Sequence, residues 1–237
     1  MSFTDQGDFQ IRCEQGERGL LALADGVRHI VIIDVLSFTS CVDVGVARGA
    51  ELIPYRWRDE SAQEFARAHN ALLAGGPSSP YSLVVESIAT VPAGTRLVLP
   101  SPNGSTLAEL AAERATVLAA CLRNAAAVSG YLNEQGGTRA IIAAGERWAD
   151  GSLRPCFEDL VGAGAVIAGL RGTRSPEAES AVAAYTAVRD RLRDVLFQCS
   201  SGRELVEKGH PRNVELAAEL NVSQCVPLLR NGGFTHA

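Results

Sequence analysis

Four short segments of the chain carry side chains that can bind an ion or attack an electrophile, and each follows an apolar run. In the first segment, Asp34 is followed by the hydroxyls of Ser37, Thr39 and Ser40. Amides at a helix N-terminus bind anions and hydroxyls add donors, while an aspartate there can hold a metal or act as a nucleophile. A structural alternative fits this segment equally well: Ser37 or Thr39 caps a helix and Asp34 makes an internal hydrogen bond.

The second segment is the run Ser101-Pro102-Asn103-Gly104-Ser105, a dense turn signal that leads into a helical pattern. Because an Asn-Gly pair permits positive φ, its consecutive amides can form a nest around the oxygens of a phosphate. Asn-Gly turns are common, so this segment taken alone favours an ordinary turn followed by a helix cap.

The third and fourth segments add an arginine, an asparagine and a pair of acids. Arg123 can pair with a phosphate or a sulfonate in fork geometry, and Asn124 can cap a helix or bind a ligand; a solvated charge is the commoner role for such an arginine. The fourth segment is Gly145-Glu146-Arg147 with, further on, Glu158 and Asp159. These two acids are neighbours in a helical pattern, so their side chains point about 100° apart. Together with Asp34 they can hold Mg²⁺ through a few oxygens and several waters, although taken alone they are typical of solvated acids near a helix N-terminus.

Strand-like apolar runs alternate with helical patterns, and this order places each polar segment at the end of a strand. We predict strands over residues 29–35, 51–55, 95–100, 115–121 and 138–146. The alternation predicts an α/β fold with a mostly parallel layered sheet and helices on both faces. Ligands of such sheets bind at the carboxyl ends of the strands, so we expect the four segments to form one cleft.

The end of the chain has a different pattern, which is helical almost throughout from residue 175 to about residue 220. We predict an α/β core with the active site over 1–174 and a helical C-terminal region over 175–237. This region packs as a cap or subdomain, or belongs to the same domain, and closes with one strand within 223–234. Two smaller predictions are a single helix over 58–74 and a loop over 146–155.

Composition and charge exclude several classes of protein. The formal net charge of −5 argues against a nucleic-acid partner, and no apolar run approaches the roughly 18 residues of a membrane span. The six cysteines form no C-x-x-C pair and the first residues do not resemble a signal peptide, so we expect no structural zinc, reduced thiols and a cytoplasmic location. A homodimer is the commonest state for an enzyme of this size, and we expect one here.

A nucleotide-binding oxidoreductase is a further alternative, but no G-x-G-x-x-G follows the first predicted strand. The pair Gly162 and Gly164 lies inside a helical pattern, where small residues usually permit close packing. A cysteine nucleophile ranks below the carboxylates, because Cys41, Cys121 and Cys156 have no adjacent histidine and no C-x₅-R arrangement.

The ordered segments resemble those of the 2-phosphosulfolactate phosphatase family. The resemblance runs from about Val31 to Leu229 and is carried by DVLSFTS, LPSPNGST, CLRNAAAV, AAGE with FEDLVGAGAVI, and SSGRELVEKG with NVELAAELNVSQCVPLL. It implies a Mg²⁺-dependent phosphatase that acts on a small anionic phosphorylated substrate; the namesake reaction removes phosphate from 2-phospho-3-sulfolactate on the route to coenzyme M. The resemblance also shows departures. The family pattern after the first aspartate runs Arg-Ala-Thr-Thr, where this chain has Ser37-Phe38-Thr39-Ser40; Ser101-Pro102 replaces Thr-Thr, and Asn213 stands where an aspartate is common.

These observations predict a Mg²⁺-dependent phosphate monoesterase. We assign catalytic roles to Asp34, Asn124 and Glu158, and metal binding to Asp34, Glu158 and Asp159. The predicted substrate-binding residues are Ser37, Thr39, Ser40, Ser101, Asn103, Gly104, Ser105, Arg123 and Arg147. The nucleophile is either Asp34 or a metal-bound water. The alternative is a catalytically altered family member that binds a phosphorylated or sulfonated metabolite.

Overall fold

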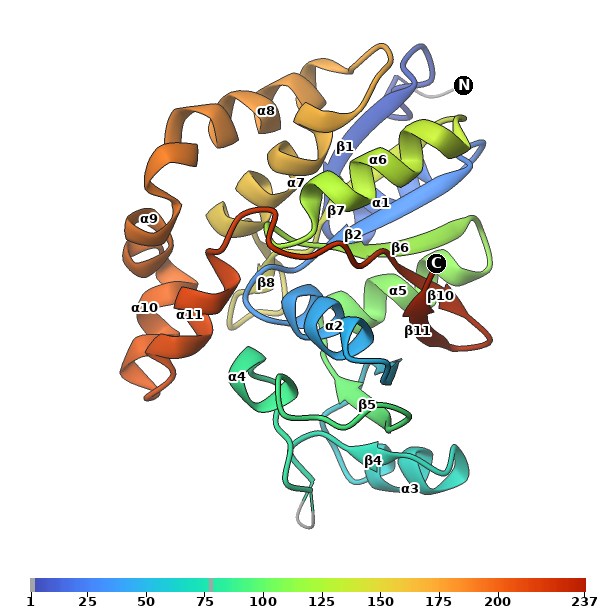
Figure 1. Ribbon diagram of the computed structural model, residues 1–237. Helices are drawn as coiled ribbons and strands as arrows, with labels where there is room; N and C mark the ends of the chain where they lie inside the picture. Colours follow the sequence, from blue (N-terminus) through green and yellow to red (C-terminus); the bar gives the residue numbers. More distant parts are fainter. Residues whose placement is uncertain (1–2, 77–78) are drawn as a thin grey trace.

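The computed structural model describes residues 3–76 and 79–237, and across these residues nine strands form one sheet (Figure 1). From one edge to the other the strands are β1 (Ile11–Gln15), β7 (Arg139–Ala143), β2 (His29–Ile33), β6 (Thr116–Ala120), β10 (Pro227–Arg230), β11 (Gly233–His236), β3 (Glu51–Tyr55), β5 (Arg96–Pro100) and β4 (Leu72–Leu73).

The sheet contains two parallel groups, β1-β7-β2-β6 and β3-β5-β4, with the antiparallel pair β10-β11 between them. Ile33 at the end of β2 lies opposite Ala120 of β6 and Ala143 of β7. These three strands therefore end at the same level, and the polar residues that follow them emerge at one edge of the sheet.

Helices cover both faces of the sheet, as predicted. Alternate side chains of β2 enter two cores: Val31 and Ile33 pack in one, and Ile30 and Ile32 in the other. The first core includes residues of α6 (Ala125–Gln135), α7 (Phe157–Gly169), α8 (Pro176–Val188), α9 (Leu192–Gln198) and α11 (Pro211–Ala217); the second includes residues of α1 (Gly16–Leu23), α2 (Phe38–Ala47), α4 (Val85–Ile88) and α5 (Gly104–Ala112). Figure 1 shows α7 and α8 on the opposite side of the sheet from α2. The remaining helices are α3 (Ser61–Ala68) and α10 (Ser200–Glu207).

The expected closing strand is instead a hairpin in the middle of the sheet. Asn231 and Gly232 both adopt positive φ, 51° and 84°, between the paired residues Arg230 and Gly233. An Asn-Gly pair in this conformation makes a two-residue turn whose twist suits a hairpin, so the segment folds back on itself. The division of the chain at residue 174 stays a prediction, although β10 and β11 lie within the same sheet as the strands before it.

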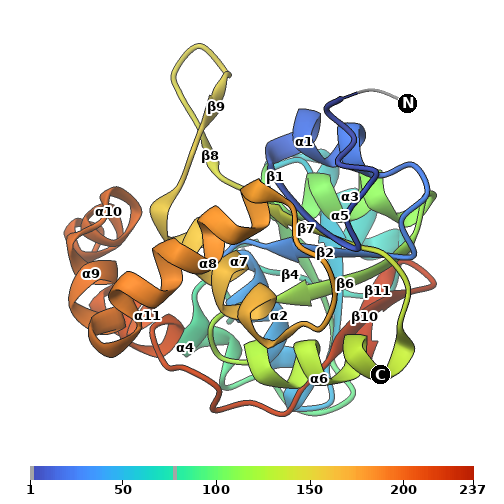
Figure 2. The same ribbon diagram turned by 90° about the horizontal axis from the view of Figure 1, so that it is seen from above.

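Three other segments differ from the expected elements. The predicted helix over 58–74 ends at Ala68, and Leu72–Leu73 pairs with β5. The expected loop over 146–155 contains the short hairpin of β8 (Glu146–Arg147) and β9 (Leu153–Arg154), which extends away from the body in Figure 2. The structure also has β1 and α1, which we did not predict.

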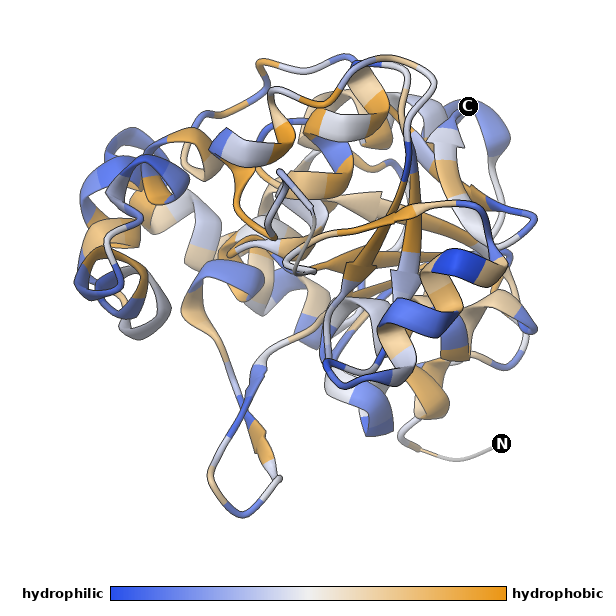
Figure 3. Ribbon diagram, turned by 90° about the horizontal axis from the view of Figure 1, so that it is seen from below, coloured by the Kyte–Doolittle hydropathy of each residue, from blue (hydrophilic) through white to orange (hydrophobic). Residues whose placement is uncertain are grey.

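Gly164 permits the close packing of α7 against α8, because a Cβ added there would lie 2.0 Å from the carbonyl oxygen of Ala181. Figure 3 shows hydrophobic strands surrounded by helices with mixed polar and apolar faces. Among the described residues, no helix combines the length and the apolar character needed to cross a membrane.

Candidate active site

Asp34 directly follows β2 and is buried, with both carboxylate oxygens held by backbone amides. Phe38 N donates to Oδ1 at 3.2 Å, and Gly104 N donates to Oδ2 at 3.0 Å. The first amide belongs to the start of α2 and the second to the start of α5. Asp34 therefore joins the loop after β2 to the loop after β5, as the placement of the two segments at strand ends predicted.

The Asn103-Gly104 pair holds two carboxylates at once. While the Gly104 amide binds Asp34, the Asn103 Nδ2 donates to Glu146 Oε1 at 2.8 Å. A Cβ at Gly104 would lie 2.3 Å from the Phe38 ring and 2.7 Å from Asp34 Oδ2, so only glycine fits this approach. The turn after β5 thus positions both acids.

Asp159 ties the ends of two neighbouring strands together from the first turn of α7. Its carboxylate accepts hydrogen bonds from Val35 N and Gly145 N, both at 2.8 Å. Glu158 precedes it and is equally buried, at 3% exposure. Adjacent helical positions point in different directions, so Asp159 braces the loops while Glu158 extends toward the N-terminus of α10. Burial and then the charge of Glu158 raise the pKa of Cys199 there.

These four acids form a cluster without a cation: Asp34, Glu146, Glu158 and Asp159. Within the described part of the chain, none of them takes part in an ion pair. The pKa of Asp34 is raised to about 7, first because the carboxyl is buried and then because Glu146 and Glu158 repel its charged form; the amides of Phe38 and Gly104 oppose this shift. Burial, Glu158 and Asp34 likewise raise the pKa of Asp159 well above its usual range. Such unneutralised burial is typical of functional sites.

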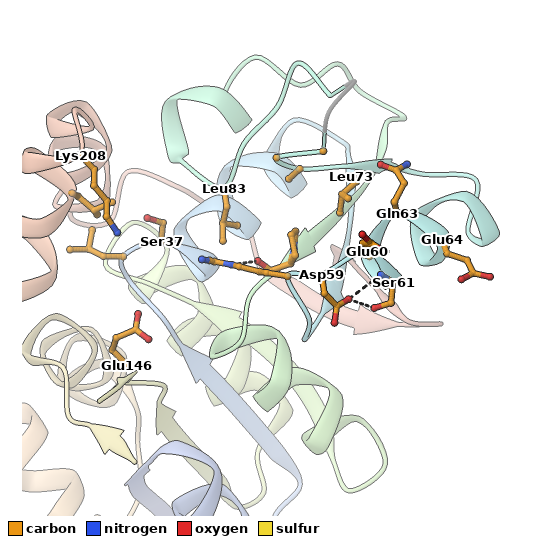
Figure 4. A pocket seen from close by; sticks show the side chains of 18 of the residues that line it. Ser37, Asp59, Glu60, Ser61, Gln63, Glu64, Leu73, Leu83, Glu146 and Lys208 are labelled. Carbon is orange, nitrogen blue, oxygen red and sulfur yellow. Dashed lines mark hydrogen bonds between the residues drawn. The ribbon is translucent and has the colours of Figure 1, made fainter. Parts of the chain in front are cut away.

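A cavity of about 1270 Å³ opens beside the cluster (Figure 4). Ser37 and Glu146 line it on the side of the cluster, Ser201 and Lys208 line it from α10 and the residue after it, and Arg58 from the loop before α3. The structure therefore brings the predicted residues Asp34, Ser37, Asn103, Gly104, Glu158 and Asp159 to one region.

Four of the predicted substrate-binding residues form hydrogen bonds with the backbone of the fold instead of lining the cavity. The hydroxyls of Thr39, Ser40 and Ser105 donate to the carbonyl oxygens of Asp34, Val35 and Leu99 at 2.8, 2.8 and 2.9 Å. These hydroxyls fix the ends of the strands. The predicted capping of the helix by Ser37 or Thr39 is wrong, because neither side chain caps α2. Ser101 is buried, and its amide donates to Tyr55 O at 2.9 Å.

Arg123 and Asn124 lie in a different polar cluster. Arg123 pairs with Asp43 at 3.1 Å and with Glu219, and it also donates to the Leu216 carbonyl. Asn124 is fully buried, and its amide group binds the backbone of Cys121, Ala119 and Cys225. The structure gives no support to the predicted roles of these two residues at the reaction centre, because their polar groups already have partners inside the fold.

Arg147 lies on β8, where it pairs with Glu17 and lines a smaller cavity of about 480 Å³. Glu146, its neighbour, lines both cavities.

Three residues to which the sequence prediction assigned no role line the large cavity of the candidate site: Glu146, Arg58 and Lys208. Glu146 stood in a segment that ends a predicted strand, which was a usable signal; the two cations lie on a loop and at a helix end, where charged residues are ordinary.

Two departures from the family pattern are neighbours in the structure. Asn213 Nδ2 donates to Ser37 Oγ at 2.5 Å, and its Oδ1 accepts from Val85 N at 2.7 Å. A neutral hydrogen bond therefore occupies the positions where the resemblance leads us to expect an arginine and an aspartate.

The fold and the site define an α/β protein with a buried acidic cluster at the strand ends beside a polar cavity. The model of the 2-phosphosulpholactate phosphatase family matches residues 22–232, and the chain belongs to this family. It is 28% identical over 214 residues to the 2-phosphosulfolactate phosphatase of Methanothermobacter thermautotrophicus, covering 88% of this chain and 89% of that protein. It is 26% identical over 224 residues to the "Probable 2-phosphosulfolactate phosphatase" of Caldanaerobacter subterraneus, covering 86% and 89% of the two chains.

The family match confirms the resemblance seen in the sequence. It also confirms, at the level of the family, the expectation of an enzyme in the phosphatase class.

Proposed function

We propose that this protein hydrolyses a phosphate monoester of a small anionic metabolite, with Mg²⁺ as cofactor, and that 2-phosphosulfolactate is the first substrate to test. The family match supports the reaction class. The observation that carries the proposal is the cluster of three buried acids and the half-buried Glu146, which has no cation among the described residues and lies beside a cavity large enough for a metabolite. A fold keeps such charge uncompensated when a ligand supplies the missing positive charge.

The side chains fit a hard cation such as Mg²⁺. Carboxylate oxygens are its preferred protein ligands, and it commonly keeps several waters and uses only one or two carboxylates. Within residues 3–76 and 79–237, no three His, Cys, Asp or Glu side chains already converge as a complete metal site. We therefore propose binding through Asp34 and Glu158, with Glu146 in reach, waters completing the shell and Asp159 acting through the backbone that it braces. When bound, the ion would stabilise the charge that develops on the phosphoryl oxygens.

The residues of the chain perform the remaining work. The amides of Phe38 and Gly104 fix the plane of the Asp34 carboxylate, and the Asn103 amide fixes Glu146 beside it. Asp34 either attacks phosphorus, which displaces the alcohol and leaves an aspartyl phosphate, or it positions the ion while water attacks. The stereochemistry at phosphorus, followed with an ester made chiral by oxygen isotopes, distinguishes the two. Two displacements through an aspartyl phosphate retain the configuration, whereas a single attack by water inverts it.

The first experiment measures phosphate release from a panel of monoesters, with Mg²⁺ and then with EDTA. Turnover of an anionic ester that EDTA abolishes is the expected result. Release that EDTA leaves unchanged would reject the metal. No release from any ester by folded protein would favour the altered, ligand-binding member of the family, for which the neutral Ser37–Asn213 pair is the main support.

We further propose a cytoplasmic location and a homodimer. All six cysteines are unpaired, and five of them are buried, as expected of thiols in a reducing compartment. Size-exclusion chromatography with light scattering tests the oligomeric state.

A further inference from the structure

Three cationic side chains line the large cavity: Arg58, Arg67 and Lys208. They stand on different walls, since Arg58 and Arg67 belong to the segment of α3 and Lys208 directly follows α10. Figure 4 shows Lys208, Ser37 and Glu146 toward one end of the cavity and the residues of α3, Gln63 and Glu64, toward the other. Lys208 therefore lies at the end of the cavity where Ser37 and Glu146 also lie.

Arg58 is fixed to the loop that builds the catalytic site. Its Nε donates to the carbonyl oxygen of Pro100 at 3.0 Å, and Pro100 ends the strand from which the Asn103-Gly104 turn departs. Among the described residues, its two terminal nitrogens have no hydrogen-bond or ion-pair partner. A guanidinium anchored by one nitrogen and open at the other two can receive a planar or tetrahedral anion in fork geometry.

Lys208 offers a second positive charge from the opposite side. Its Nζ contacts Glu204 Oε1 at 2.5 Å, and both side chains are more than half exposed. An exposed pair of this kind contributes little free energy, so the ammonium can turn to a ligand at small cost. Its two remaining N–H groups can donate to an anion without breaking the contact with Glu204.

The lining of the cavity carries more acids than cations, because the three cations face five acids: Asp59, Glu60, Glu64, Glu146 and Glu204. A phosphate monoester brings further negative charge toward this wall and the buried cluster, and a second anionic group on the alcohol would add to the repulsion. The cavity volume of about 1270 Å³ leaves room for that group away from the cluster. Cations at the wall would attract it and set the orientation of the ester.

We propose that Arg58 and Lys208 form a second-anion subsite, which selects phosphate monoesters whose alcohol also carries a sulfonate or a carboxylate. This inference rests on the proposed phosphatase function of the same cavity. Arg58 orients the second anion through paired hydrogen bonds, and Lys208 adds an unoriented charge. Both are specificity-determining residues, because neither touches the bond that breaks.

The test compares three esters that differ in the group beside the phosphate: 2-phospholactate with a carboxylate, O-phosphoisethionate with a sulfonate, and isopropyl phosphate with neither. For Arg58→Gln we expect kcat/KM to fall about 10-fold to 100-fold on the two anionic esters, mostly through KM, and to change less than about 3-fold on isopropyl phosphate. Lys208→Gln should show the same pattern at about 3-fold to 10-fold. A loss confined to one anionic ester identifies which group the subsite prefers.

Arg67→Gln is the matched control, since Arg67 lines the same cavity from α3 and carries the same charge. It should leave all three esters within about 2-fold. Equal losses on neutral and anionic esters in Arg58→Gln, or an equal effect of Arg67→Gln, would reject the subsite while leaving the phosphatase intact.

Calorimetric titration with sulfolactate, which contains no phosphate, separates the two proposals. Wild type should bind it and Arg58→Gln should bind at least about 10-fold more weakly. Retained binding by wild type, lost in the variant, with no turnover of any ester would keep the subsite and reject the phosphatase. Equal binding by both proteins would reject the subsite.

Discussion

Two buried polar clusters follow the strand ends of this protein, and they treat their carboxylates in opposite ways. In the first, Asp34 contacts amides and lies close enough to other acids for their charges to raise its pKa. In the second, Asp43 on α2 accepts from Arg123 at 3.1 Å and from the Ser223 hydroxyl at 2.6 Å. Both aspartates are buried, and burial raises the pKa of both, but of the two only Asp43 has a cation as partner among the described residues.

The difference distinguishes a candidate active site, around Asp34, from a structural cluster around Asp43 that connects parts of the fold. The Asp43 cluster links α2 to the loop after β6 and to the segment before β10, and its buried carboxylate has a cation of the chain as partner. The Asp34 cluster lies beside a cavity, and no cation among the described residues pairs with its acids. Sequence position alone did not distinguish the two clusters, because the residues of each lie at strand ends or on the helices that follow.

The sharpest test of this contrast makes the same substitution in each cluster. Asp34→Asn should lower kcat by about 1000-fold, because it removes the charge that holds the cofactor or attacks phosphorus. Steady-state phosphate release at saturating ester measures it. Asp43→Asn is the matched control and should keep kcat within about 5-fold while lowering the unfolding midpoint in urea. Comparable losses of kcat in both variants would erase the distinction between the clusters.

Arg123→Gln should destabilise the protein by about 3 kcal/mol, because it leaves the Asp43 carboxylate buried without its cation. The Arg123 side chain is 13% exposed and Glu219 is 41% exposed, so solvent screens part of the pair and the lower end of the usual range applies. Urea unfolding gives the free energy, and the KM for the best ester should stay within about 2-fold. A large rise in KM with unchanged stability would restore the predicted substrate-binding role of Arg123.

Gly104→Ala should cost about 2 kcal/mol of stability and lower kcat by about 100-fold, because the new Cβ would overlap the Phe38 ring and push against Asp34 Oδ2. Gly130→Ala provides the control, since nothing lies within 4 Å of a Cβ there and the residue is in a helix. Thermal unfolding and phosphate release are measured on both. Full activity of Gly104→Ala would show that the Asn103-Gly104 turn does not position the site.

The stability of the metal-free protein should fall as pH rises from about 4 to 7. The folded pKa of Asp34, about 7, exceeds the 3.8 of a free aspartate, so the folded chain binds more protons than the unfolded chain in this range. Mg²⁺ requires ionised carboxylates, and at ten times its Kd it should add about 1.4 kcal/mol at pH 8 and nearly nothing at pH 5. Urea unfolding with EDTA or Mg²⁺ at the two pH values checks this.

Asp34→Asn is the control for the pH experiment. It should weaken the dependence between pH 4 and 7, to which Asp159 and Asp43 also contribute because their pKa values are raised. It should also remove most of the Mg²⁺ stabilisation, whereas Asp43→Asn should leave the response to Mg²⁺ in place. Stabilisation by Mg²⁺ that is the same at both pH values would place the ion away from the cluster.

The sequence by itself determined the α/β class and the helices on both faces, and it placed the candidate site at strand ends. Periodic apolar runs such as His29–Ile33 specify a buried strand locally, and the order of such runs restricts the topology to a few forms. The Asp34 segment, the Asn103-Gly104 turn and the Glu158–Asp159 pair could be selected for the same reason, since a residue that follows a strand emerges at its carboxyl end.

Only the tertiary structure decided which polar residues face the cavity and which serve the fold. Thr39 and Asn124 turn inward to backbone partners, Arg123 meets an aspartate 80 residues away in the chain, and Glu146 reaches Asn103 from 43 residues away. The sequence also did not predict the position of β10 and β11 in the middle of the sheet. They pair with β6 and β3, which are distant in the chain, and such pairing depends on which strand edges the two parallel groups leave free. Packing decides whether a buried carboxylate meets a partner that is far away in the sequence. A carboxylate with such a partner is structural, and one without it is available to a ligand.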